Sequence, residues 1–139
     1  MANKNIAVIG GSGFIGTRLV GNLLESGHEV KIVDKQDSAT YSGLRVAGDV
    51  RSVDDLVKGC AGCNVIYNLA AEHADDVRPL SLYDDVNVQG ARNVCIAAEK
   101  LGINEIIFTS SVAIYGFSER ELDEESETNY INDYGRTKY

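Results

Sequence analysis

Short apolar runs alternate with longer amphipathic segments along the chain. The runs are rich in Val, Ile and Leu and predict strands at 5–9, 30–34, 44–47, 64–69 and 105–109. Apolar residues recur at spacings of three and four in the longer segments, which predicts helices at 14–26, 52–59 and 80–101. Strands that alternate with helices form a parallel sheet with helices on both faces. We therefore expect an α/β fold with a doubly wound parallel sheet.

Local signals mark where the predicted helices begin and end. Ser52 followed by Asp55 resembles a capping box in which Asp replaces the usual Glu, so this pair predicts a helix start. Gly27 follows the first predicted helix and Gly102 follows the last, as glycine does at many helix ends. The polar, turn-rich segment 35–43 is expected to be a connection.

Three glycines separate the first predicted strand from the first predicted helix. Gly10, Gly13 and Gly16 have the spacing G-x-x-G-x-x-G. Gly10 allows a tight turn, Gly13 allows phosphates to approach the backbone, and Gly16 allows the helix to pack closely on the strand. The N-terminus of the helix adds unpaired N–H groups and the positive end of its dipole, which favour an anion. Glycine-rich turns are common, but this order of strand, turn and helix predicts a dinucleotide pyrophosphate site that includes Phe14 and Ile15.

The second predicted strand closes on an acidic residue. Asp34 lies 18 residues beyond Gly16, where dinucleotide-binding folds place the carboxylate that holds the adenosine ribose hydroxyls. A carboxylate at this position would repel the 2′-phosphate of NADP, so the predicted cofactor is NAD. Lys35 softens this preference without removing it. The expected fold is therefore a Rossmann-type sheet that binds NAD.

Length, charge and hydropathy narrow the possible partners. The 139 residues can bury one core, and 44% hydrophobic with 24% charged residues is typical of a soluble globular protein. The formal net charge of −8 argues against nucleic acid as a partner. No apolar stretch reaches the length that spans a bilayer, and the N-terminus lacks the character of a signal peptide. We therefore expect no membrane partner and a cytoplasmic location.

Two other clusters have both a structural and a chemical interpretation. Cys60 and Cys63 form a C-x-x-C, but a zinc site needs a second pair and a redox site needs the motif to open a helix. We interpret them as small residues of a turn, and Cys95 as a small core residue. The segment 119–127 contains six acidic residues that could bind a cation, yet it lacks the spacing of a calcium loop. A solvated loop is the simpler interpretation, and no metal site is expected.

The end of the chain carries a candidate proton-transfer pair. Tyr134 and Lys138 lie four residues apart, so on a helix they share one face. An ammonium beside a phenol lowers the pKa of the tyrosine, which can then take a proton from an alcohol near neutral pH. Ser111, at the end of the last predicted strand, could hydrogen-bond the same substrate oxygen, with Ser110 as the nearest alternative.

Together these motifs resemble the extended short-chain dehydrogenase/reductase family, in particular its branch of NAD-dependent nucleotide-sugar epimerases and dehydratases. The resemblance covers essentially the whole chain. It implies that the catalytic residues are Ser111, Tyr134 and Lys138. It also implies a cofactor site made of the glycine turn, the ribose acid, a pair beside the adenine, the end of the fourth strand and a helix asparagine: Gly10, Gly13, Phe14, Ile15, Gly16, Asp34, Asp49, Val50, Asn68, Leu69, Ala70, Ala71 and Asn87.

Several of these positions have a structural interpretation as well. Asp49 could be a turn acid, Asn68 a hydrogen-bonding group at a strand end, and Asn87 a polar residue on a helix face. Their joint order along the chain favours the functional interpretation. His73 could also approach the cofactor, but a surface role is the simpler interpretation of a lone histidine.

The resemblance implies an enzyme that inverts C4 of a nucleotide sugar, with a UDP-hexose as the expected substrate, through a transient 4-keto sugar. The 4,6-dehydratases of this branch carry Asp-Glu directly after the catalytic hydroxyl, whereas this chain has Val112 and Ala113, which disfavours dehydration by that route. A net nucleotide-sugar reductase or dehydrogenase of the same family is the alternative enzyme. A non-catalytic NAD-sensing module is the alternative of a different class, because a fold does not by itself determine function.

Members of this family are considerably longer than the present chain and add a smaller substrate-binding domain. We therefore expect residues 1–139 to form an incomplete NAD-binding domain that lacks the substrate-binding domain and shows little or no turnover alone. The resemblance also implies a homodimer of the full-length form with helix 80–101 at its interface. The oligomeric state of this chain stays open.

Overall fold

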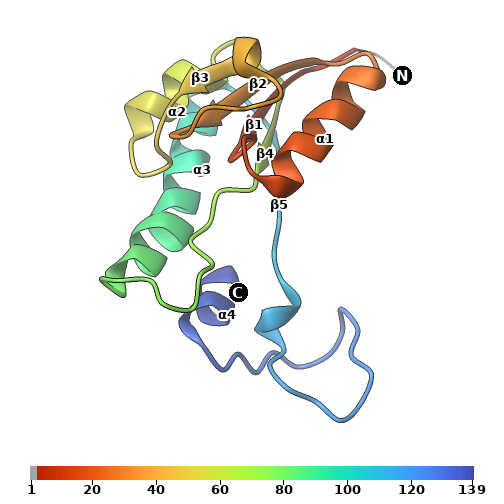
Figure 1. Cartoon of the computed structure of the whole chain (residues 1–139), viewed down its shortest axis with the longest axis vertical. Coiled ribbons are helices and arrows are strands. Elements are labelled where there is room, and N and C mark those ends of the chain that lie inside the picture. Colours follow the sequence, from red (N-terminus) through yellow and green to blue (C-terminus); the bar gives the residue numbers. More distant parts are fainter. Residues whose placement is uncertain (1–2) are drawn as a thin grey trace.

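The computed structural model describes residues 3–139. Five strands form one parallel sheet in the order β3-β2-β1-β4-β5 (Figure 1). This order, with the first strand in the centre, is typical of doubly wound dinucleotide-binding folds, and the predicted fold class is confirmed. The strands are β1 (Asn5–Ile9), β2 (Glu29–Asp34), β3 (Arg45–Ala47), β4 (Val65–Asn68) and β5 (Glu105–Phe108).

Helices cover both faces of the sheet. Helix α1 (Phe14–Glu25) lies on one face, and α2 (Val53–Cys60) and α3 (Gly90–Leu101) lie on the other (Figure 1). A short helix η1 (Ser42–Leu44) belongs to the connection that leads into β3. The helices predicted at 14–26 and 52–59 are confirmed within one residue at each end.

Successive side chains of β1 alternate between two hydrophobic cores. Ile6 and Val8 belong to the core shared with α1, whereas Ala7 and Ile9 belong to the core shared with α2 and α3. All four side chains are buried. Burial on both faces explains why the sequence of this central strand is one continuous apolar run.

The carboxyl ends of the central strands lie at one edge of the sheet. Ile9 pairs with Val33 in β2 and with Asn68 in β4, and Asn68 pairs with Phe108 in β5. The glycine turn, Asp34 and the segments that follow β4 and β5 therefore leave the sheet side by side. Ligands of doubly wound folds bind at this edge, where the strand order reverses.

The helix predicted at 80–101 is present, but its first half is not a regular α-helix. Residues Tyr83–Gln89 form the π-helical segment η2, which continues directly into α3. Tyr83, Val86 and Asn87 of this segment are buried. Hydrophobic periodicity predicts a helix here but does not distinguish this π-helical segment from an α-helix.

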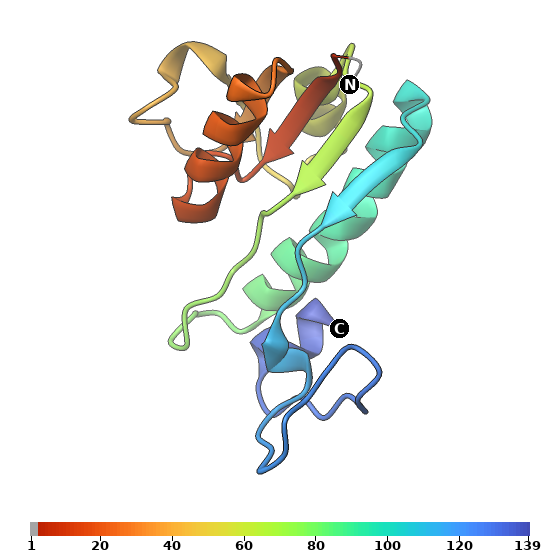
Figure 2. The ribbon, with the colours of Figure 1, turned by 90° about the vertical axis from the view of Figure 1, so that its right-hand side faces the viewer.

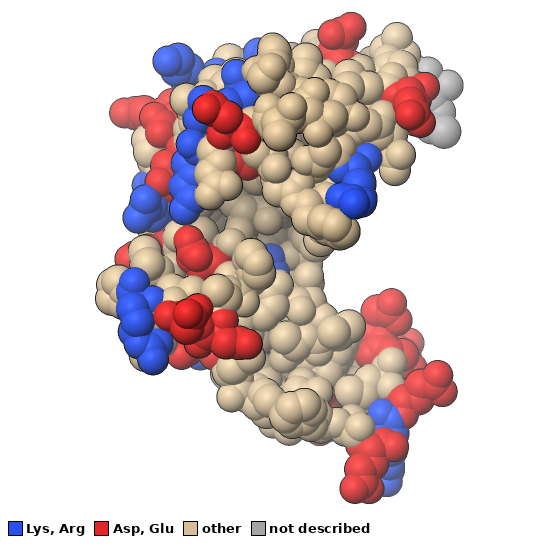
Figure 3. All heavy atoms as spheres, viewed as in Figure 1, with Lys and Arg blue, Asp and Glu red and all other residues tan. Residues whose placement is uncertain are grey.

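The segments after β5 extend beyond the carboxyl edge of the sheet (Figure 2). They contain the short helix η3 (Val112–Ile114), a long irregular connection, and helix α4 (Asp133–Lys138). The acidic side chains of 119–127 are exposed, and acidic atoms are prominent at the tip of these segments in Figure 3. The interpretation of 119–127 as a solvated loop agrees with this exposure.

Helix α2 begins as its sequence predicts, with the Oγ of Ser52 accepting the N–H of Asp55 at 3.2 Å. We expect Ser52→Ala to lower the free energy of unfolding by about 1 kcal/mol, because this N–H loses its acceptor. Urea denaturation measures the difference. The exposed Ser42→Ala is the control and should change stability by less than about 0.5 kcal/mol. Equal stability of wild type and Ser52→Ala would contradict the prediction.

The structure shows the surroundings of the three cysteines. Cys60 and Cys63 are buried, and burial raises the pKa of the Cys60 thiol to about 12 and also raises that of Cys63. Within residues 3–139, no group of His, Cys, Asp and Glu is arranged to hold a metal ion. The expectation that Cys95 is a core residue is wrong: it is exposed, because the neighbouring Val94 and Ala97 supply the buried face of α3.

None of the helices formed by residues 3–139 combines the length and the apolar character needed to cross a membrane.

Candidate functional site

A cleft of about 550 Å³ lies at the carboxyl edge of the sheet, and the molecule is visibly hollowed between the sheet and the C-terminal segments (Figure 3). Most of the predicted cofactor residues and both members of the predicted proton-transfer pair line it. The predicted residues that line the cleft are Gly10, Gly13, Phe14, Ile15, Gly16, Asp34, Asp49, Val50, Leu69, Ala70, Ala71, Tyr134 and Lys138. Residues from five parts of the sequence thus meet in one cavity.

The glycine turn is built by close backbone packing. Gly10 has a φ of +78°, and its N–H donates to the carbonyl of Val33 at 2.9 Å, which ties the turn to the end of β2. A Cβ atom on Gly16 would lie 2.6 Å from the carbonyl oxygen of Gly10, so α1 can approach the turn only with glycine there. A Cβ on Gly13 would meet only that same oxygen, at 3.5 Å. Gly13 is therefore free of packing constraints and exposed toward the cleft.

The N-terminus of α1 is open to an anion. Gly13 is its N-cap and provides no side-chain cap, and the first turn contains no acidic residue. Phe14 and Ile15 in this turn are exposed and line the cleft. The first N–H groups of a helix lack partners inside the helix, so they and the helix dipole favour a negatively charged ligand.

Asp34 is held rigidly at the end of β2. One carboxylate oxygen accepts the N–H of Ser12 at 3.0 Å and the other accepts the N–H of Gln36 at 2.9 Å. Each oxygen keeps further acceptor capacity for a ribose hydroxyl. The ammonium of Lys35 lies 3.5 Å from the carboxylate of Glu72, and both residues line the cleft. The positive charge of Lys35 therefore lies next to the carboxylate of Glu72.

The next acid along the cleft, Asp49, is paired with Arg51. The guanidinium of Arg51 donates to both carboxylate oxygens at distances between 2.6 and 3.1 Å, which lowers the pKa of Asp49. Val50 is buried beneath it, and its carbonyl accepts the side-chain amide of Asn93 at 3.1 Å. The segment around Asp49 and Val50 is therefore a turn, in agreement with the structural interpretation of Asp49. It also forms part of the wall of the cleft.

Tyr134 and Lys138 lie on α4 and both face the cleft, as their spacing predicts. The side chain of Asn132 caps this helix by accepting the N–H of Gly135 at 2.7 Å. Lys138 is only 4% exposed, and its ammonium lies 4.3 Å from the centre of the Phe108 ring. Burial lowers the pKa of Lys138.

Lys138 holds a buried charge, and none of the ion pairs formed within residues 3–139 includes it. We expect Lys138→Met to raise the free energy of unfolding at pH 7 by about 1 kcal/mol, because the cost of burying the charge disappears. The lowered pKa means that the unfolded chain binds this proton more readily than the folded one. The free energy of unfolding of the wild type therefore rises with pH between the lowered pKa and the usual lysine pKa. Over this pH range the stability difference between Lys138→Met and wild type becomes smaller.

Urea denaturation of Lys138→Met and wild type at several pH values between 7 and about 10.5 measures this effect. Lys100→Met, an exposed lysine on α3, is the control. A Lys138→Met variant that is less stable than wild type at pH 7, or a difference that does not change with pH, would contradict the prediction.

Three predicted site residues lie outside the cleft. Ser111 lines a neighbouring hollow of about 490 Å³, and its Oγ accepts the N–H of Ala113 at 3.2 Å. Asn68 is buried at the end of β4, where its side chain accepts the N–H of Ala70. Asn87 is buried as well and contacts the backbone of Glu72. Ser110, the alternative to Ser111, donates to the carbonyl of Lys138 at 3.0 Å.

Sequence reasoning did not assign several residues that line the cleft. Most of them adjoin a predicted site residue at the end of a strand, and this adjacency was the available signal. They are Ile9, Val33, Lys35, Gln36, Gly48, Glu72, His73, Val86 and Thr109. His73 is exposed, as its surface interpretation requires, and also reaches the cleft.

Comparisons with known proteins agree with this geometry. Residues 6–139 match the model of the NAD dependent epimerase/dehydratase family. The chain is 47% identical over 137 residues to the N-acetyl-alpha-D-glucosaminyl-diphospho-ditrans,octacis-undecaprenol 4-epimerase of Escherichia coli O157:H7, covering 99% of this chain and 41% of that protein. It is 32% identical over 158 residues to UDP-glucose 4-epimerase 3 of Oryza sativa subsp. japonica, covering 99% of this chain and 42% of that protein.

A solved structure shows the same fold. The UDP-glucose 4-epimerase from Brucella ovis, solved in complex with NAD, superposes with a TM-score of 0.89 at 32% sequence identity. The superposition covers 99% of this chain and 45% of that structure. The chain thus spans less than half the length of each of these relatives.

Proposed function

Because the chain belongs to the NAD dependent epimerase/dehydratase family, we propose that it carries the cofactor cleft and the proton-transfer groups of a sugar 4-epimerase. The observation that supports this most strongly is that Tyr134 and Lys138 line the same cleft as the glycine turn and Asp34. A proton-transfer pair beside a dinucleotide site is what reversible oxidation of an alcohol requires.

The residues of the cleft fit NAD. The turn at Gly10 and the open N-terminus of α1 provide a site for the diphosphate. The fixed carboxylate of Asp34 provides acceptors for the adenosine ribose hydroxyls and repels a 2′-phosphate. The Lys35–Glu72 ion pair strengthens the preference for NAD, because Glu72 neutralises Lys35, a cation that lines the cleft next to Asp34.

Tyr134 is the group we propose as the base. Its phenolate would take the proton of the C4 hydroxyl while the hydrogen on C4 leaves with its electron pair, so that the sugar becomes a 4-keto sugar. NAD, when bound, supplies the chemistry of taking up that hydride and giving it back to the other face of the carbon. Tyr134 would then return the same proton to the oxygen. Lys138 would place a positive charge in the same cleft, and Ser111, which lines the neighbouring hollow, would hydrogen-bond the sugar oxygen.

The proposed substrate is a hexose linked through a diphosphate, with a UDP-hexose as the first candidate. UDP-glucose 4-epimerases are among the relatives and among the similar structures. A specific observation favours a second candidate: the identity of 47% belongs to an enzyme named for an undecaprenol-linked N-acetylglucosaminyl diphosphate. Val112 and Ala113, which follow Ser111, cannot move protons, so the elimination of water by an acid–base pair at this place is disfavoured.

The test is to incubate the NAD-loaded whole protein that carries residues 1–139 with UDP-glucose, UDP-galactose, their N-acetyl forms and a polyprenyl-diphosphate-linked N-acetylglucosamine, because residues 1–139 alone are expected to show little or no turnover. We expect interconversion of the 4-epimers of one of these classes, measured by chromatography or NMR, with no net change in absorbance of the reduced nicotinamide. A stoichiometric rise in that absorbance would instead indicate a dehydrogenase. Failure to interconvert any pair would contradict the proposal.

A further inference from the structure

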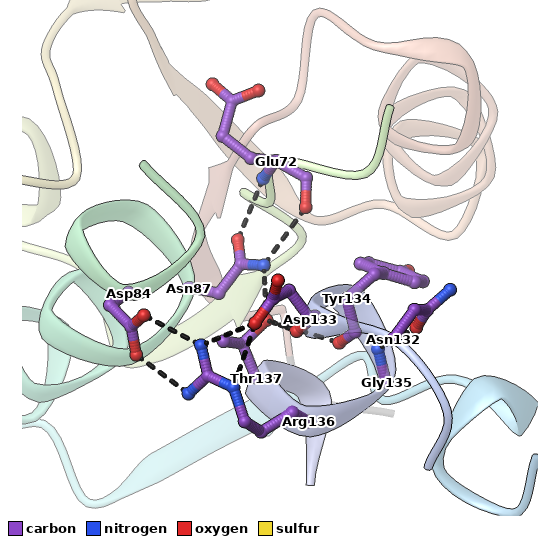
Figure 4. Close-up of polar contacts among 9 residues, drawn as sticks. All are labelled: Glu72, Asp84, Asn87, Asn132, Asp133, Tyr134, Gly135, Arg136 and Thr137. Atoms are coloured by element: carbon purple, nitrogen blue, oxygen red, sulfur yellow. Dashed lines mark hydrogen bonds and ion pairs between the residues drawn. The ribbon is translucent and has the colours of Figure 1, made fainter. Parts of the chain in front are cut away.

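We propose that Thr137 and Arg136 are positioning residues that dock α4 and thereby place Tyr134 and Lys138 in the cleft. The inference rests on the proposed function, because it concerns how the proposed proton-transfer pair is held. Thr137 and Arg136 stand between the two members of that pair in the sequence. Tyr134 and Lys138 line the cleft, whereas the side chains of Thr137 and Arg136 bond to η2 (Figure 4).

Helix α4 begins at its Asn132 cap and packs between η2 and η3. On one side Ser110 donates to the carbonyl of Lys138, and on the other side two side chains of α4 bond to η2. Those connections determine where its cleft-facing residues lie.

The first connection runs through a buried amide. The Nδ2 of Asn87 donates to the hydroxyl oxygen of Thr137 at 2.9 Å, while that hydroxyl donates to the carbonyl of Asp133 at 2.8 Å. The same amide is bonded on its other side to the backbone of Glu72, accepting its N–H at 2.8 Å and donating to its carbonyl at 3.0 Å (Figure 4). Asn87 is 3% exposed and Thr137 is 6% exposed, so water does not readily replace these bonds.

This amide therefore joins α4 to the cofactor side of the cleft. Glu72 lines the cleft and pairs with Lys35, which follows the proposed ribose acid. A single side chain, Asn87, fixes the backbone of Glu72 and the hydroxyl of Thr137 at the same time. Asn87 thus connects the cofactor wall directly to the helix that carries the proton-transfer pair.

The second connection is an ion pair on the outer side of α4. The guanidinium of Arg136 makes a bidentate contact with Asp84 of η2, at 2.9 and 2.7 Å, and also contacts Asp133 at 3.1 Å (Figure 4). The guanidinium lowers the pKa of Asp84. A bidentate contact fixes the orientation of the guanidinium as well as its distance from the carboxylate. Arg136 therefore helps to orient α4, while Thr137 holds it against Asn87.

Loss of the Thr137 contact should displace α4 without dismantling the cleft. Small misplacements of a reacting group carry a large kinetic cost, about 100-fold for 1 Å. We therefore expect Thr137→Val, which has the same shape but accepts no hydrogen bond, to lower kcat roughly 10- to 100-fold. Thr137→Ser keeps the acceptor and should stay within about twofold of wild type, since the bond from Asn87 is preserved.

The experiment uses the whole protein that carries residues 1–139 and measures kcat and KM with the sugar pair that the wild type interconverts, together with NAD affinity by titration. In Thr137→Val, the loss should fall on kcat, while KM and NAD affinity should change less than about threefold, since the lost contact is made by neither ligand. Asp84→Asn, an exposed substitution that leaves the core intact, should also lower kcat, by a smaller factor, and leave KM within about threefold of wild type.

Equal losses in Thr137→Val and Thr137→Ser would overturn the inference, as would a Thr137→Val variant with the kcat of wild type. A Thr137→Val variant that fails to fold leaves the decision to Asp84→Asn, where an unchanged kcat overturns it. Tyr134→Phe separates this inference from the proposed function. If Tyr134→Phe keeps full activity, the proposed function fails; if it is inactive while Thr137→Val is normal, only the positioning role fails.

Discussion

The Gly13→Ala variant is expected to keep the fold and to lose roughly 100-fold in NAD affinity. A Cβ at this position would meet only the Gly10 carbonyl oxygen, at 3.5 Å, so the folded protein tolerates it. The methyl group would project into the cleft that Gly13 lines, where the diphosphate must approach the backbone. Titration with NAD and urea denaturation measure the two effects separately.

Gly16→Ala is the contrasting variant. Its Cβ would lie 2.6 Å from the Gly10 carbonyl oxygen and from the Gly11 Cα, and these backbone atoms cannot move aside cheaply. We expect it to lose stability on the order of 3 kcal/mol together with NAD binding. Gly43→Ala, where a Cβ meets nothing within 4 Å, is the control for both. A Gly13→Ala variant with wild-type NAD affinity would contradict the position assigned to the diphosphate.

Removal of one hydroxyl should stop the proposed reaction. We expect Tyr134→Phe to lower kcat about 1,000-fold. Among the described residues that line the cleft, Tyr134 is the one tyrosine, so no other phenol there can accept the sugar proton. NAD affinity and the free energy of unfolding should change little, since the Tyr134 side chain lines an open cleft. Steady-state kinetics with the interconverted sugar pair, NAD titration and urea denaturation measure these quantities.

Tyr139→Phe is the matched control for this prediction. Tyr139 directly follows Lys138, is 76% exposed, and does not line the cleft. Its substitution should leave kcat within about twofold of wild type, as expected for a surface position. A Tyr134→Phe variant with more than a tenth of wild-type kcat would assign the proton transfer to another group.

Much of the fold follows from the hydrophobic pattern alone. The continuous apolar run of β1 reflects burial on two faces, and the periodic run after Gly13 reflects a helix with one buried face. Local signals also placed helix ends correctly, since Ser52 caps α2 and Gly102 adopts a φ of +67° after α3. The π-helical segment Tyr83–Gln89 could not be predicted, because its apolar spacing resembles that of an α-helix.

The cofactor side of the site was predictable for a physical reason. The ends of parallel strands converge, so residues that close successive strands meet even when they are far apart in the sequence. Gly10, Asp34 and Leu69 are such residues, and all line the cleft. The spacing of Tyr134 and Lys138 placed both on the cleft-facing side of α4 in the same way.

The contacts between elements could not be predicted. The bond between Asn87 and Thr137 joins residues 50 positions apart, and the Arg136–Asp84 pair joins residues 52 apart. Neither depends on a local pattern. Cys95 was expected to be buried because its neighbours in the sequence are apolar. It is exposed, because α3 turns Val94 and Ala97 toward the core and Cys95 toward the surface. Tertiary packing decides such details, and periodicity gives only the average face of a helix.

We propose that one cleft holds both NAD and the proton-transfer pair. A crystal structure of the protein with NAD tests this proposal most directly. We expect the diphosphate against the first turn of α1, the adenosine ribose on the carboxylate of Asp34, and the nicotinamide on the side of Tyr134 and Lys138. A cofactor bound elsewhere, or one whose nicotinamide points away from Tyr134, would contradict it.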